Sequence, residues 1–77
     1  MLSCILIAGS LWIEQTPDSG YYLNINTFTG IGRTEESADI HFTKDGIASY
    51  PVTLPEQLQD ASIPEILAAC EAVAREQ

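Results

Sequence analysis

Apolar positions in the first third of the chain follow the two-residue period of β-strands. Residues 4–8 form a continuous apolar run, which is typical of a strand covered on both faces. Gly9 and Ser10 interrupt the run and either bend one long strand through a bulge or turn a hairpin, and we favour the bend. The extended stretch ends near residue 15, because residues 16–20 combine Pro, Asp, Ser and Gly, the residues of tight turns.

The turn at residues 16–20 folds this strand against residues 21–26. Ile13 then lies opposite Leu23 or Ile25, and both registers keep the large apolar side chains on one face, whereas a slip by one residue would flip them. The other face carries Trp12, Glu14, Tyr22, Asn24 and Asn26.

Residues 29–37 contain two glycines and two carboxylates without periodicity, which predicts a loop. Residues 38–54 predict a second hairpin. A two-residue turn at Asp45 and Gly46 would pair Phe42 with Ser49 and mix the faces, so we favour a loop of residues 44–46, which pairs Phe42 with Ala48. Two residues farther from the turn, Ile40 then pairs with Tyr50, and Ala38 with Val52. Pro51 has no amide hydrogen, which predicts an edge strand.

The end of the chain carries the clearest signal. Ser62 and Glu65 have the spacing of a capping box, in which each side chain accepts the other residue's backbone amide. Apolar residues then recur at helical spacing: Ile63, Ile66, Leu67, Cys70, Val73 and Ala74. Glu71 and Arg75 stand four residues apart, as in a helix-stabilising ion pair. A short helical turn is expected over residues 55–59.

These elements predict one α+β domain over residues 1–77. Its core is a four-stranded, mainly antiparallel sheet of two hairpins, with one C-terminal amphipathic helix packed on one face. At 77 residues the chain buries a thin core, so a partner or a second copy is a plausible source of added stability.

Net charge changes this picture more than composition does. Eleven acidic residues against three basic ones give −8, a field that favours solubility and, beyond that, a partner with a basic surface. Three basic residues are too few to neutralise phosphates, so we expect no direct binding of nucleic acid. Glu35, Glu36 and Asp39 form the densest acidic group, which is either a solvated loop or a contact surface for that partner.

Trp12 and Tyr22, beside Glu14, complete the predicted partner-binding residues. Tryptophan and tyrosine bury much area at low entropic cost, so exposed aromatic pairs are common contact anchors. The alternative, that residues 2–8 cover the two rings, stays open.

The cysteines and the apolar start of the chain bear on localisation. Cys4 and Cys70 form no metal-binding pair, and each sits among apolar residues, which favours reduced and buried thiols. The first thirteen residues lack a basic segment and are too short to span a bilayer, so we interpret them as a buried strand. The expected location is cytoplasmic.

No set of residues in the sequence indicates catalysis. His41, the single histidine, is expected on an exposed strand opposite Ser49, without a third orienting group or an oxyanion site. Gly30 and Gly32 are too few for a phosphate cradle. We therefore predict no catalytic residues, no cofactor and no metal.

The leading functional hypothesis is non-enzymatic. The size and charge are those of a small acidic inhibitor or adaptor that occupies a basic, nucleic-acid-handling site on a larger protein, a class that includes phage-encoded anti-defence inhibitors. The alternative is a self-associating structural module, a homodimer through a sheet edge or the aromatic face. A small enzyme that uses His41 is a remote third hypothesis.

Overall fold

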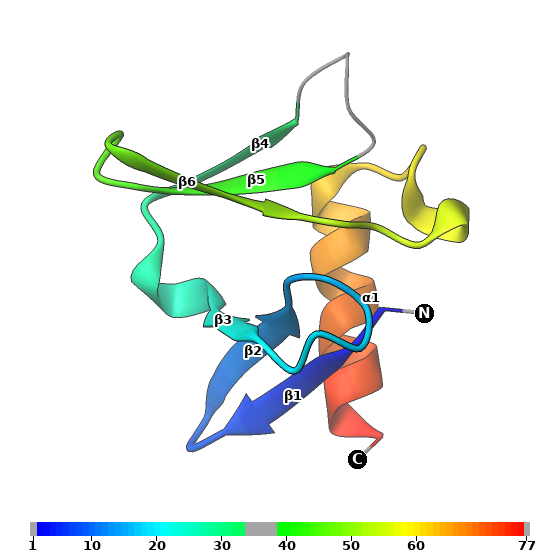
Figure 1. Cartoon of the computed structure of the whole chain (residues 1–77). Helices are drawn as coiled ribbons and strands as arrows, with labels where there is room; N and C mark the ends of the chain where they lie inside the picture. Colours follow the sequence, from blue (N-terminus) through cyan, green and yellow to red (C-terminus); the bar gives the residue numbers. More distant parts are fainter. Residues whose placement is uncertain (1, 34–38, 77) are drawn as a thin grey trace.

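The chain forms two separate three-stranded antiparallel sheets and one C-terminal helix (Figure 1). The structure is a computed structural model that describes residues 2–33 and 39–76. The first sheet has the order β1-β2-β3 and consists of Cys4–Ile7, Ser10–Glu14 and Tyr22–Asn24. The second has the order β4-β5-β6 and consists of Gly30–Arg33, Ile40–Lys44 and Ala48–Val52. The prediction of a single four-stranded sheet is therefore wrong, although the α+β class holds.

The extra strand of the first sheet comes from a hairpin where we expected a bend. Ala8 and Gly9 have φ values of 51° and 83°, and Ile7 pairs with Ser10 across them. Two consecutive residues with positive φ make the tight turn whose twist matches that of antiparallel strands. Ala8 takes this conformation at a cost of roughly 1–2 kcal/mol. Alanine is uncommon in this conformation, so of the two turn residues only Gly9 indicates the turn in the sequence.

The second connection of this sheet follows one of the two predicted registers. Ile13 pairs with Leu23, and both are buried. Beyond β3 the chain does not stay extended. Residues Ile25–Thr27 form a 3-10 turn, η1, in which the Asn24 side chain accepts a hydrogen bond from the Asn26 amide at 3.0 Å.

The second sheet includes a strand, β4, in the segment that we expected to be a loop. β4 pairs with β5, with Ile31 opposite Phe42. Two of its four residues are glycine, so the strand carries too few side chains to show a period in the sequence. At Gly30 a Cβ would lie 2.6 Å from the Thr43 hydroxyl oxygen, so a larger residue in β4 would require the Thr43 side chain to move. Residues 34–38 lie outside the described residues.

The β5–β6 hairpin has a three-residue loop, shifted by one residue from the expected one. Residues 45–47 form the turn, so Phe42 pairs with Tyr50 instead of Ala48 and Ile40 with Val52 instead of Tyr50. The change moves the pairing by two positions, which leaves every side chain on its predicted face. β6 is an edge strand, as Pro51 predicted.

The helical predictions are confirmed. α1 spans Ile63–Arg75, and Ser62 and Glu65 form the capping box. Glu71 and Arg75 pair at 2.8 Å. The short turn η2 spans Glu56–Leu58, within the expected range. α1 passes beside β1 and toward the second sheet (Figure 1), so the core gathers side chains from both sheets and the helix: Leu2, Cys4, Ile13, Leu23, Ile40, Phe42, Val52, Leu54, Ile66, Cys70 and Ala74.

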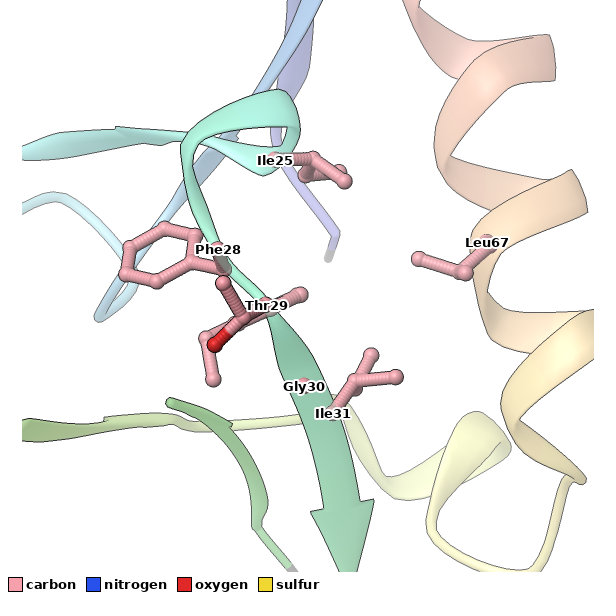
Figure 2. A pocket seen from close by; sticks show the side chains of 7 residues that line it. Ile25, Phe28, Thr29, Gly30, Ile31 and Leu67 are labelled. Carbon is pink, nitrogen blue, oxygen red and sulfur yellow. The ribbon is translucent and has the colours of Figure 1, made fainter. Parts of the chain in front are cut away.

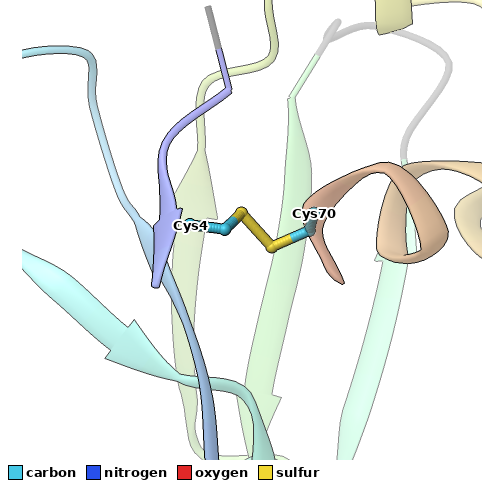
Figure 3. Close-up of a disulfide and its surroundings, with 2 residues drawn as sticks. All are labelled: Cys4 and Cys70. Carbon is cyan, nitrogen blue, oxygen red and sulfur yellow. A yellow bond between two sulfur atoms is a disulfide. The ribbon is translucent and has the colours of Figure 1, made fainter. Parts of the chain in front are cut away.

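Cys4 and Cys70 form a disulfide that ties β1 to α1 (Figure 3). Their Cα atoms lie 5.4 Å apart, and neither residue is exposed. The expectation of two reduced thiols is therefore wrong. Both cysteines do lie among apolar residues, as expected, but the packing of α1 on β1 brings together two positions that are 66 residues apart.

Candidate binding site: an aromatic groove

A groove lined by aromatic side chains runs between β2 and β3 on one side and β5 and β6 on the other. Its volume is about 260 Å³. The side chains that matter for recognition are Trp12, Tyr21, Tyr22, Phe28, Lys44 and Tyr50, and we call this set the aromatic groove. Binding grooves of proteins have this composition: an apolar surface with a few polar groups that orient what binds there.

The β2–β3 register brings the two predicted aromatic residues to the same face. Trp12 pairs with Asn24 and Glu14 with Tyr22, so Trp12 and Tyr22 are diagonal neighbours across the two strands. Both are half-buried. Residues 2–8 cover Trp12 only in part: Ile5 of β1 is its cross-strand partner, and Trp12 remains half-buried.

The Trp12 indole contributes an apolar wall. Its Nε1 is buried and has no hydrogen-bond partner among the described residues. By contrast, the neighbouring Tyr21 side chain is 62% exposed and offers a large surface to a partner.

Glu14 organises the loop that presents Tyr21. Its carboxylate accepts hydrogen bonds from the backbone amides of Asp18, at 3.3 Å, and Gly20, at 2.8 Å. Asp18 and Gly20 have φ values of 62° and 74°, which bends the chain sharply there. The sequence placed Glu14 among partner contacts; in the structure this carboxylate supports the rim of the groove.

Phe28 fixes the far wall by ring contacts. Its centroid lies 5.3 Å from that of Phe42 and 5.5 Å from that of Tyr50, the latter edge to face. Aromatic pairs at such distances contribute roughly 0.5–1.5 kcal/mol beyond the area they bury. Phe42 is almost fully buried, so Phe28 and Tyr50 rest on a rigid part of the core.

The lining of the groove includes a charged side chain. The exposed Lys44 lines it, and Asp45 follows directly in the β5–β6 turn. Of the acidic group predicted as a partner contact, Glu35 and Glu36 lie outside the described residues. Asp39 is half-buried, directly before β5.

The carboxylate of Glu65, in the first turn of α1, also has a distinct environment. A hydrogen bond from the Ser62 hydroxyl, and a second from the Ser62 amide, lower the pKa of Glu65 below its usual value of 4.5. This is the chemistry of a helix cap, which satisfies amides at the N-terminus of α1.

The expected Ser49 neighbour of His41 is not its strand partner. His41 pairs with Pro51, a residue that supplies no hydroxyl. Within residues 2–33 and 39–76, no three His, Cys, Asp or Glu side chains gather as a metal site. In the same ranges, no helix has the length and apolar character needed to cross a membrane.

A second hollow lies on the other side of Phe28, between β4, η1 and α1 (Figure 2). Its volume is about 200 Å³. We call it the apolar cleft; the side chains that form its walls are Ile25, Phe28, Ile31, Phe42 and Leu67.

The sequence suggested part of the aromatic groove and none of the apolar cleft. Trp12 and Tyr22 were found because two adjacent strands with one tight turn determine which residues share a face. Phe28 and Tyr50 join them only through the approach of the second sheet, and the Tyr21–Tyr22 pair was the one local signal that more aromatic surface lay here.

Comparison with protein-family models, with curated proteins and with solved structures finds no match for this chain.

Proposed function

We propose that this chain is a non-enzymatic binding module, a small acidic inhibitor or adaptor that occupies a basic site on a larger protein. The observation that supports it is the aromatic groove, a hollow with Trp12, Tyr21 and Tyr22 on one wall, in a domain of net charge −8. Aromatic anchors in a pocket supply most of the binding energy of typical interfaces. The surrounding charge selects which partners approach.

The charge distribution indicates how such a partner would lie. Lys44 at the groove disfavours a cation directly against the rings, so the groove itself suits apolar atoms and carbonyl oxygens. The cationic part of the partner would then lie against the surrounding carboxylates, of which the exposed Asp18 and Asp45 are nearest in sequence to Tyr21 and Lys44.

A nucleic-acid-handling protein fits this description in its chemistry. Surfaces that hold phosphates are rich in Lys and Arg, and they bind through a salt-dependent attraction. An acidic domain competes for the same residues. The acidic charge therefore favours partners of this class, and the aromatic groove supplies an apolar contact that salt does not weaken.

The test is capture of partners by the full chain, washed first at low and then at high salt, with mass spectrometry of the eluates. We expect a basic, nucleic-acid-binding protein that salt releases. Purified, it should bind Tyr21→Ala about tenfold or more weakly than the wild type. The matched control is Ile47→Ala, which truncates a side chain that is 91% exposed and outside the groove.

The charge contribution is tested with the same partner. Neutralising Asp18 and Asp45 to Asn keeps side-chain size, and Asn tolerates the positive φ of 62° and 55° at these positions. Charge reversal at Glu35, Glu36 and Asp39 tests the acidic group predicted from sequence. Affinity that ignores salt and survives both sets of changes would rule out the electrostatic proposal.

Self-association is the second candidate, and it is supported by β1. This edge strand exposes Leu6 at 41% and Ile7 at 50%, and Cys4–Ile7 contains no charge or proline that would block pairing with another strand. We expect Leu6→Lys to weaken any dimer. Sedimentation that shows a strict monomer at high concentration would end this candidate.

The disulfide bears on where the protein acts. Disulfides are rare in cytosolic proteins because thiol reductants keep cysteines reduced. The cytoplasmic location inferred from reduced thiols therefore loses that support and becomes a proposal to test. Alkylation of free thiols in freshly lysed cells, followed by mass measurement, decides it: a protected Cys4–Cys70 pair would place the chain in an oxidising compartment.

A further inference from the structure

The apolar cleft is formed by three elements that are distant in sequence. Ile25 of η1 and Ile31 of β4 point across it toward Leu67 of α1 (Figure 2). Phe28 and Phe42, whose ring centroids lie 5.3 Å apart, also line the cleft. All five side chains pack against the core or belong to it, so the walls are held by the same contacts that hold the fold.

The walls offer nothing to a charged or strongly polar ligand. The lining includes the hydroxyl group of Thr29, which already has hydrogen-bond partners within the protein. Its Oγ1 accepts a hydrogen bond from the Asp45 amide at 2.9 Å and donates one to the Thr43 carbonyl at 3.4 Å. Among the described residues, no charged side chain lines the cleft. Burying an ion or an unpaired polar group there would cost several kcal/mol, so the occupant must be apolar.

The volume of the cleft limits the size of the occupant. A cavity of about 150 Å³ accepts a benzene ring. About 200 Å³ therefore accommodates one large aliphatic or aromatic side chain, and it is too small for an extended lipid chain.

Phe28 connects the cleft to the aromatic groove, because it lines both. A partner segment that crosses Phe28 would lay its backbone and apolar atoms along the groove, with its cationic side chains directed away from Lys44, and would insert one side chain into the cleft. At net charge −8, the residues that flank this side chain are favoured when they are cationic.

We propose that the apolar cleft is an anchor pocket that receives one large apolar side chain, such as Leu, from a segment of the partner whose neighbouring residues are Lys and Arg. The inference rests on the proposed function and specifies the partner: a basic surface alone is insufficient, and a single apolar residue within it determines affinity. Fully buried aliphatic side chains contribute enough to separate such a partner from other basic proteins by tenfold or more.

The experiment uses two short, capped peptides of Lys and Arg that differ only at the centre, where one carries Leu and the other Gln. Each is titrated into the full chain while the methyl resonances of Ile25, Ile31 and Leu67 are recorded. We expect the Leu peptide to bind at least about tenfold more tightly, with shifts at these methyl groups, and the Gln peptide to bind without them.

Two helix variants test the position of the anchor. Leu67→Trp fills the cleft and should remove the difference between the peptides. Ala68→Trp adds the same ring at the next, exposed position of α1 and should preserve it. If Leu67→Trp does not fold, as judged by its amide spectrum, the methyl shifts of the wild type decide alone.

The outcomes separate the two proposals. Equal, salt-sensitive binding of both peptides without cleft shifts overturns the anchor pocket and leaves the acidic binding module in place. A separate hollow is lined by Leu58 and Val73, and preference for Leu with methyl shifts only there also overturns the anchor pocket. Failure of both peptides to bind even at low salt overturns both proposals.

Discussion

Reduction of the Cys4–Cys70 disulfide should remove a large share of the stability of this domain. The bond closes a loop between residues 66 positions apart, nearly the whole chain. In the chain-entropy treatment a loop of this length restricts the unfolded state by about 4.4 kcal/mol. A domain of this size is stable by roughly 4–12 kcal/mol in total, so reduction should remove between about a third and all of that free energy.

The assay is urea unfolding of the oxidised and the reduced protein, followed by tryptophan fluorescence of Trp12. With an m-value of about 1 kcal/mol per molar urea, the midpoint should fall by about 4 M on reduction, or the reduced chain should be unfolded without urea. The double variant Cys4→Ala and Cys70→Ala is the control, because a reductant must leave its midpoint unchanged. A loss below about 1 kcal/mol in the wild type would refute the loop-entropy reasoning and show that packing of α1 on β1 holds the ends without the bond.

Substitutions at the helix cap, in the β5–β6 hairpin and β4, and in the core test further predictions. Ser62→Ala should cost about 1 kcal/mol of unfolding free energy in chemical denaturation, because it removes the helix cap. Hydrogen bonds from Ser62 lower the pKa of Glu65 below 4.5, so their contribution is complete above that pH and is lost as the pH falls through the lowered pKa; Glu65→Gln should flatten the stability profile there. Gly46→Ala should lower the free energy of unfolding by about 1–2 kcal/mol, because φ at this position is +70°. Gly32→Ala, whose Cβ would meet open space, should change that free energy by less than about 0.5 kcal/mol. Phe42→Ala removes an almost fully buried ring and should cost about 3–5 kcal/mol of unfolding free energy in urea denaturation.

Local chemistry explains which predictions held. The capping box at Ser62 and Glu65 is a contact between residues three apart, so the sequence contains all of its parts. The pairing of Ile13 with Leu23 is one of the two registers that the tight turn left open, and the buried face excluded a slip by one residue. The β5–β6 loop was displaced by one residue and still kept its faces, because a shift of the pairing by two positions preserves the alternation.

The errors arose where weak local signals depend on distant partners. β4 has two glycines among four residues, and it is a strand because β5 supplies the hydrogen-bonding edge beside it. The turn at Ala8 and Gly9 needs a residue in an unfavourable conformation, which the antiparallel pairing of β1 and β2 stabilises. Neither effect can be read from a window of a few residues.

By itself the sequence determined the acidic charge, the capped C-terminal helix, the inward and outward faces of β2, β3, β5 and β6, and the shared face of Trp12 and Tyr22. These follow from composition, from helical and strand periods, and from contacts within one turn. Only the tertiary structure decided that the strands form two sheets, that Cys4 meets Cys70, and that Phe28 separates an aromatic groove from an apolar cleft. Those features depend on how α1 and the two sheets pack together, and packing joins residues whose separation in sequence leaves no periodic trace.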